Sequence, residues 1–217
     1  MAKIFDKGLI AKKVGMTRMV DDAGKMIPVT VLEVENQKVT KVLTPERDGY
    51  HGVQLGYFLK AEKNLTKPDV SRLRKSGVEE NFSRFVEFRT PGPVEAMGLN
   101  SKIGADLFEG VAQVDITGST KGRGFQGAVK RWNSSIGRMT HGSRFHRRPG
   151  SLGQCTTPGR VYKNKKQPGH MGVENRTVRN LKVMKIDATR NLIAIKGSVP
   201  GTRNGYLEVR PSIGSGK

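Results

Sequence analysis

The sequence predicts a mainly β fold, in which a small closed or nearly closed barrel or sandwich carries one long basic loop. Short segments rich in β-branched residues recur along the chain, and turn residues separate them, which is typical of antiparallel strands. Seven or so such segments with little helix favour a closed sheet, because closure hides strand edges. The loop is predicted by residues 118–173, which hold twelve Lys or Arg and no Asp or Glu.

The first half of the chain supplies several of these strands. Residues 8–20 (GLIAKKVGMTRMV) predict a strand, a turn and a second strand, with a glycine at each bend. Residues 27–35 and 39–43 are rich in β-branched residues, and the turn-like residues 35–37 between them predict an antiparallel pair. Residues 51–59 (HGVQLGYFL) predict a further strand.

A small α-containing insert is expected at about residues 60–98. Residues 66–69 (TKPD) resemble a helix start with Pro in the first turn, and Gly77 can end that helix. Three phenylalanines then recur at every third position, Phe82, Phe85 and Phe88. This spacing suits core packing or a strand edge better than a cofactor site.

Strands are also predicted on both sides of the basic stretch. Residues 111–117 (VAQVDIT) lead directly into it. After it, residues 181–187, 192–197 and 206–210 alternate apolar and polar side chains and are joined by short turns. The basic stretch is therefore a loop between strands of one body.

We accordingly predict two parts. Residues 1–117 and 174–217 form a β-barrel body that includes the insert, and residues 118–173 form an extended loop. Only seven of the 56 loop residues are Leu, Ile, Val or Phe, which is below the roughly one-fifth that a segment needs to fold alone. Eleven glycines and three prolines also interrupt every regular pattern there.

The charge of the chain is concentrated in the loop. The net charge is +20, yet the 161 residues outside the loop hold 27 basic and 19 acidic residues. Such concentration favours a phosphate backbone as partner, since each Lys or Arg laid on a phosphate releases condensed counterions. Order in the loop must then come from an irregular polyanion, and structured nucleic acid fits this description.

A membrane partner is not expected, because no amphipathic or lipidated anchor accompanies the charge and no run approaches the ~18 apolar residues of a membrane span. The N-terminus is too charged for a secretory signal. The single cysteine, Cys155, excludes an internal disulfide and fits a reducing compartment. The sequence therefore predicts a cytoplasmic protein.

Three other patterns in the loop are set aside on chemical grounds. Residues 122–127 match GxGxxG, but a dinucleotide site also needs an acidic residue about twenty positions on and βαβ repeats. Cys155 and the loop's three histidines match no zinc pattern and stand among a dozen cations. A catalytic site would need a general acid or base, and the loop holds no carboxylate. We expect no cofactor, no metal and no enzymatic activity.

One short amphipathic helix is predicted near the root of the loop. Phe125, Val129 and Trp132 lie at i, i+4 and i+7 within residues 124–132 (GFQGAVKRW). Trp132 has two interpretations, an anchor against the protein's own body, which is favoured, or a ring stacked on an unpaired base.

Longer motifs carry a resemblance to a known family. They are KGRGFQGAVKRW, THGSRFHRRPGSLGQ, TPGRVYKNKKQPGHMG and TVRNLKV, with GLIAKKVGMTRM near the start and NLIAIKGSVPG near the end. In this order they closely resemble the bacterial form of large-subunit ribosomal protein three, over almost the whole chain and more loosely over residues 60–104. The resemblance implies a β-barrel body of the kind shared with translation factors, bound to large-subunit ribosomal RNA. It also implies a long loop that reaches toward the peptidyl transferase centre.

Partners and one modification follow from the same resemblance. Neighbouring large-subunit ribosomal proteins are implied as partners within the ribosome. Gln154 of the GSLGQ motif at residues 150–154 matches a glutamine that is N5-methylated in some bacteria, which implies a glutamine methyltransferase as a further partner.

The expected function is that of a structural constituent of the large ribosomal subunit, which binds ribosomal RNA directly, supports assembly and braces RNA near the peptidyl transferase centre. The alternative is an architectural DNA-binding protein, which would usually show a dimerising core and a symmetric pair of arms. The candidate RNA-binding residues are Lys12, Lys13, Arg18, Lys121, Arg123, Lys130, Arg131, Trp132, Arg138, His141, Arg144, His146, Arg147, Arg148, Gln154, Arg160, Lys163, Lys165, Lys166 and His170.

Overall fold

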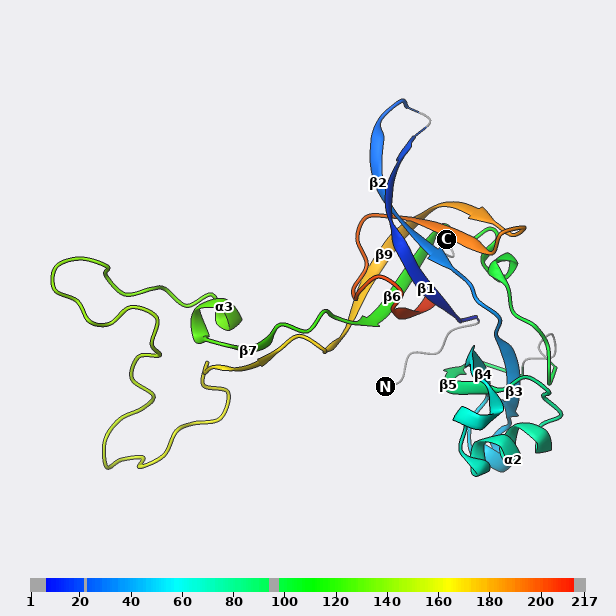
Figure 1. Cartoon of the computed structure of the whole chain (residues 1–217), viewed down its shortest axis with the longest axis horizontal. Coiled ribbons are helices and arrows are strands. Elements are labelled where there is room, and N and C mark those ends of the chain that lie inside the picture. The colour runs from blue at the N-terminus through cyan, green and yellow to red at the C-terminus, as the bar shows by residue number, and fades with distance from the viewer. Residues whose placement is uncertain (1–6, 22, 94–97, 213–217) are drawn as a thin grey trace. The chain divides into compact units, whose positions relative to one another are not determined.

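Six strands close into a barrel. In order around it they are β1 (Leu9–Val20), β11 (Tyr206–Pro211), β6 (Gln113–Ser119), β9 (Asn175–Asp187), β10 (Leu192–Lys196) and β2 (Met26–Glu33). β1 pairs antiparallel with both β2 and β11 (Figure 1). The computed structural model describes residues 7–21, 23–93 and 98–212.

A second sheet has three strands, paired antiparallel in the order β3 (Lys38–Leu43), β4 (Gly52–Leu59) and β5 (Phe82–Arg89). The helical elements of this part of the chain are α1 (Pro45–Asp48), η1 (Glu62–Asn64), α2 (Lys67–Lys75) and η2 (Ala105–Phe108). The prediction of a mainly β chain with few helices is confirmed.

The chain divides into two compact units. Residues 1–118 and 175–217 form the first, which we call the body, and residues 119–174 form the second, which we call the basic loop. The basic loop holds β7 (Gly124–Gln126), α3 (Ala128–Trp132) and β8 (Gly169–Met171), and β7 pairs antiparallel with β8.

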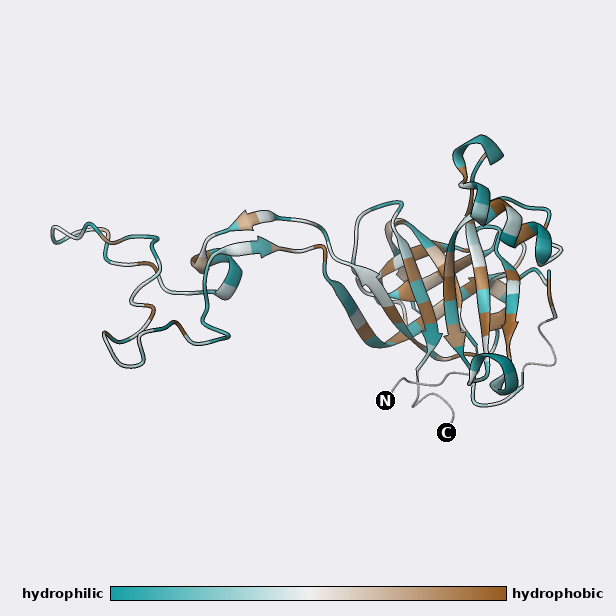
Figure 2. Cartoon of the chain, turned by 90° about the horizontal axis from the view of Figure 1, so that it is seen from below, coloured by the Kyte–Doolittle hydropathy of each residue, from teal (hydrophilic) through white to brown (hydrophobic). Residues whose placement is uncertain are grey.

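Apolar side chains at alternating strand positions make the core of the body. Ile193 and Ile195 of β10 are fully buried, and they pack in one cluster with Val39 and Leu55 of the three-stranded sheet. Figure 2 shows apolar residues gathered on the strands of the body. The two sheets therefore share one core, and the period of two along each strand explains why the sequence indicated strands.

The predicted insert contains a helix and a strand. α2 begins after Thr66, whose hydroxyl donates to an Asp69 carboxylate oxygen at 2.7 Å, and it ends before Gly77, whose φ is +68°. Leu73 packs in a small second core with Val78 and Phe82. The phenylalanine spacing belongs to β5, in which Phe82 and Phe88 are buried, so the structure supports core packing at these positions.

Two predicted turns are wrong. Leu9–Val20 forms the single strand β1, because the register of its pairing with β2 shifts between Lys13 and Gly15, which leaves Val14 as the extra residue and lets the strand continue where a turn was predicted. β2 and β3 also do not pair as a hairpin, since β2 lies between β1 and β10 in the barrel while β3 pairs with β4. The chain between them passes from one sheet to the other.

Gln37 occupies that passage and explains why no turn forms there. Its side chain is 1% exposed, accepts from the Ile10 backbone N–H at 3.0 Å and donates to the Ile10 carbonyl at 3.2 Å. The described pairing of β1 with β2 begins only at Lys12, so the Gln37 amide takes the place of a neighbouring strand at Ile10.

Replacing Gln37 by Ala should lower the free energy of unfolding by about 2–4 kcal/mol. The substitution leaves two buried backbone groups of Ile10 without partners, each worth ~1–3 kcal/mol, and also opens a cavity. Urea denaturation of the free protein measures the loss. Asn36→Ala, which removes an exposed amide one residue earlier, is the control and should change stability by less than about 0.5 kcal/mol. Equal losses for the two variants would refute this role of Gln37.

Candidate nucleic-acid interface

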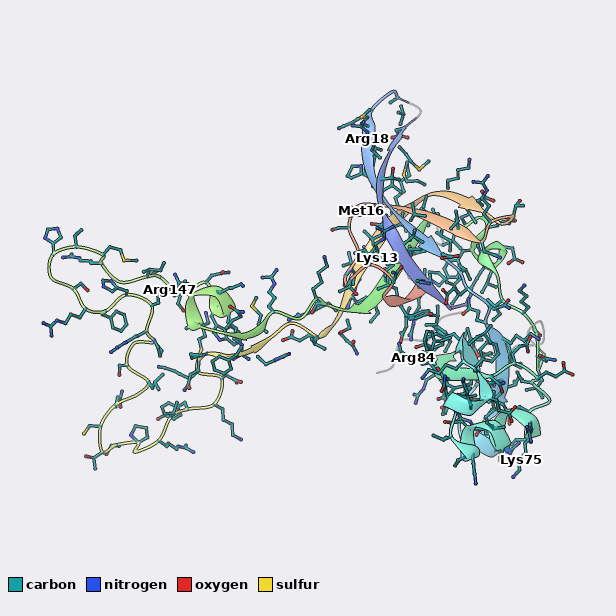
Figure 3. All side chains as sticks on the ribbon, in the orientation of Figure 1. Lys13, Met16, Arg18, Lys75, Arg84 and Arg147 are labelled. Atoms are coloured by element: carbon teal, nitrogen blue, oxygen red, sulfur yellow. The ribbon has the colours of Figure 1, made fainter. Side chains whose placement is uncertain are left out.

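The basic loop has almost no interior of its own. Ala128, which is 4% exposed, is the one buried residue among those described between positions 119 and 174. Glu174 is the one acidic residue in this unit, and it stands at the unit's last position. Figure 3 shows the side chains of the loop standing along an open backbone. A segment with so little buried apolar area depends on a partner for most of its stability.

The root of the loop is a narrow antiparallel ladder. Thr120 N–H donates to the Glu174 carbonyl at 2.9 Å, and β7 and β8 continue the pairing, with Phe125 opposite His170. This pairing corrects the predicted helix over residues 124–132, which begins only at Ala128. Phe125 lies in β7, not in the helix, and its side chain is 76% exposed.

Trp132 and Arg131 tie α3 to the returning strand of the loop. The Trp132 indole N–H donates to the Gln167 carbonyl at 2.9 Å, and Arg131 Nη1 donates to the same oxygen at 3.0 Å. The guanidinium of Arg131 lies 5.0 Å from the Trp132 ring centre. These contacts anchor Trp132 to another segment of the basic loop, whereas the prediction placed the anchor against the body.

Gly137 closes the distal part of the loop. Its N–H donates to the His146 carbonyl at 2.8 Å, and a Cβ at this position would lie 2.0 Å from the Phe145 carbonyl oxygen. Only glycine therefore permits this approach of the two backbones. The contact holds together the ends of a smaller loop that carries Arg138, His141 and Arg144.

Most of the predicted RNA-binding residues of the loop are exposed. The exposed ones are Lys121, Arg123, Lys130, Trp132, Arg138, His141, Arg144, Arg147, Arg148, Gln154, Arg160, Lys163, Lys165, Lys166 and His170. Arg131 and His146 are half-buried. The loop thus brings one sign of charge to its surface, and individual RNA contacts of these residues remain predictions.

Exposed aromatic residues of the loop were missed by the sequence analysis. Phe145 is 44% exposed and Tyr162 is 58% exposed, and the guanidinium of Arg160 lies 5.6 Å from the Tyr162 ring centre. The signal that could have found them is an aromatic residue placed among cations, since such rings stack on unpaired bases.

The cations of β1 behave differently from one another. Lys12 Nζ lies 2.7 Å from a Glu35 carboxylate oxygen, and Lys13 Nζ donates to the carbonyls of Val199 at 2.9 Å and Gly201 at 3.2 Å. Arg18 is exposed further along the strand (Figure 3). Lys12 and Lys13 therefore already contribute to the structure of the body, whereas Arg18 is presented at its surface.

Glu35 is the centre of a small network in the body. Tyr206 Oη donates to its second carboxylate oxygen at 2.6 Å. Burial would raise the pKa of Glu35, but hydrogen bonds from Lys12 and Tyr206 and the charge of Lys12 outweigh burial and lower it. The hydrogen bond to Glu35 and its negative charge raise the pKa of Lys12. The pair is therefore ionised at neutral pH.

Other kinds of site find no support among the residues that the structure describes. No group of three or more His, Cys, Asp or Glu side chains there could hold a metal ion. No helix in the described ranges is long and apolar enough to span a bilayer.

Comparison with known proteins gives consistent matches. The family model described as Ribosomal protein L3 matches residues 99–192. The chain is 48% identical to the large ribosomal subunit protein uL3 of Vibrio cholerae, over 95% of this chain and 98% of that protein. It is 47% identical to the protein of the same name from Photobacterium profundum and 46% identical to that from Shewanella baltica, each over the same shares of the two chains.

The Lys12–Glu35–Tyr206 network predicts a pH-dependent stability. A carboxyl whose pKa is lower in the folded state stabilises the fold above its unfolded pKa of ~4.3 and loses this contribution as pH falls through the folded value. Glu35→Gln should therefore be less stable than the unmodified protein at pH 6–7, as measured by urea denaturation, and the two should converge at acidic pH. Glu33→Gln controls for the loss of one negative charge. Parallel pH curves for Glu35→Gln and the unmodified protein would contradict the assignment.

Proposed function

Because this chain belongs to the ribosomal protein L3 family, we propose that its basic loop binds folded large-subunit ribosomal RNA and that its body anchors the loop. The chain is a structural constituent of the large ribosomal subunit and not an enzyme, and its place is in the ribosome. The observation that carries the proposal is the basic loop itself, with twelve cations, one buried residue and a single carboxylate at its end.

The chemistry of the loop suits a crowded phosphate backbone. Lysine and arginine neutralise phosphates that RNA folding brings together, and each such contact releases counterions. Gly137 lets two loop segments approach more closely than any side chain would allow. Hydrogen bonds from Arg131 and Trp132 to the Gln167 carbonyl give the root a defined shape.

RNA fits these features better than duplex DNA does. Irregular RNA offers unpaired bases and 2′-hydroxyls. Exposed rings such as Phe125, Phe145 and Tyr162 can stack on the unpaired bases. The alternative of an architectural DNA-binding protein is set aside by the family to which the chain belongs.

The loop braces RNA near the peptidyl transferase centre in this proposal, as the sequence resemblance implied. It contributes positive charge and shape there rather than proton transfer, since residues 119–173 contain no carboxylate. Neighbouring large-subunit proteins are further partners. Gln154 is exposed, so a glutamine methyltransferase can reach its side chain.

Salt dependence tests whether loop cations contact phosphates. Replacing Arg138, Arg144 and Arg147 together by Ala should reduce the slope of log affinity against log salt by about two to three. Each lost phosphate contact removes roughly 0.7–0.9 from the magnitude of that slope. Filter binding of ribosomal RNA at several salt concentrations measures this slope. Replacing Lys63, Lys67 and Lys75 of the body removes the same charge and is the control. An equal change in both variants would argue against the loop as the main contact.

Deletion of residues 134–157 tests what the loop does in the subunit. The body should still fold and join reconstituted large subunits, because its core lies outside the deleted segment. Assembly should slow, and peptide-bond formation or antibiotic sensitivity should change. A glycine-serine segment of equal length is the control for chain length. Unchanged assembly and peptidyl transfer would mean that the loop is a passive tether.

A further inference from the structure

The basic loop contains a pocket that the proposed function does not yet use. Three segments that are distant in the sequence line it, residues 128–135, 145–152 and 164–166, and its volume is about 430 Å³. This lies within the ~300–1,000 Å³ of sites that hold small ligands, so the pocket can admit one compact group but not a double helix.

We propose that this pocket binds a single unpaired nucleotide of the ribosomal RNA, with its base against Phe145 and its phosphates near Arg148, Lys165 and Lys166. The inference rests on the proposed function, because it takes RNA as the partner of the loop. It goes beyond that function by assigning one recognition site and one kind of ligand to it.

The walls of the pocket match the flat face of a base. Phe145 lines the pocket and keeps 44% of its surface exposed, so one part of the ring is available for stacking. Val129 and Leu152 line the pocket as well and are half-buried. An aromatic ring with aliphatic neighbours stacks on any base, which suits a base displaced from its helix.

The polar lining matches the rest of a nucleotide. Arg148, Lys165 and Lys166 are exposed cations at the pocket, and residues 119–173 contain no carboxylate that would neutralise them. Hydroxyl groups of Ser134 and Ser135 also line it. A hydroxyl both donates and accepts hydrogen bonds, so these serines can pair with a ribose 2′-hydroxyl or a base edge.

Two hydrogen bonds restrain the backbone around Phe145. Gly137 donates to the adjoining His146 carbonyl at 2.8 Å, and the Phe145 N–H donates to Ser143 Oγ at 3.3 Å. These hydrogen bonds restrain the backbone that carries the Phe145 ring, while most of the order of the loop still depends on its partner.

Chemical probing of large subunits reconstituted with the full-length protein tests the proposal. Dimethyl sulfate methylates N1 of unpaired adenines and N3 of unpaired cytosines, and a carbodiimide modifies N3 of unpaired uracils and N1 of unpaired guanines, so together they report whether the edge of a base is enclosed by the pocket. Phe145→Ala should raise the modification of one or two unpaired bases by roughly fivefold or more, since loss of one stacking ring weakens base binding to at least that degree. The double variant Lys165→Ala with Lys166→Ala should raise the modification of the same bases. Both lysines are exposed, so their replacement should not disturb folding.

Matched controls use loop residues that do not line the pocket. Tyr162→Ala removes another exposed ring, and Lys163→Ala removes another exposed cation. Neither variant should raise the modification of those bases. Deletion of residues 134–157 should raise the reactivity of ribosomal RNA bases near the loop. If it does so while the pocket variants give the same reactivities as the unmodified protein, the pocket does not hold a nucleotide. The pocket proposal is equally refuted if its variants release a neighbouring protein without exposing a base. If even the deletion exposes no RNA, the proposed function itself fails.

Discussion

Repulsion among cations that have no carboxylate partner limits the stability of the basic loop. Ion pairs stabilise cations elsewhere in this chain, as between Lys12 and Glu35, but residues 119–173 offer no carboxylate for such a pair. The loop also buries only Ala128, so hydrophobic burial cannot balance the repulsion. In the proposed function, phosphates of the ribosomal RNA supply the missing negative charge and order the loop. The body must therefore be stable without the loop.

The body meets this requirement through closure and a shared core. Its six-stranded barrel leaves no open edge around its circumference, and the three-stranded sheet packs into the same apolar cluster. At Ile10, where the described β2 pairing has not yet begun, the Gln37 side chain satisfies the backbone instead. Barrel closure, the shared core and the Gln37 hydrogen bonds all lie within the body. The charge of the loop can therefore be high without weakening the barrel.

The sequence predicted features that arise from local pattern and composition. Alternating apolar residues located strands such as β10, Pro68 and Gly77 located α2, and the lack of carboxylates located the basic loop. Pairing between distant residues was not predictable. A turn was predicted at Gly15, where the strand continues past a register shift that depends on its partner β2. Phe125 was assigned to a helix because its partner strand β8 lies more than forty residues away in the sequence. The pocket at Phe145 was missed for the same reason, since its three lining segments meet only in the folded loop.

The loop is inserted between β6 and β9, which are neighbours in the barrel. A single backbone cut within the loop would divide the chain into halves, one with β1, β2 and β6 and the other with β9, β10 and β11. These halves are interlocked, because β11 pairs with β1 and β6 while β10 pairs with β2. A nicked molecule would consequently stay together as a two-chain complex, so a cut in the basic loop does not release either half.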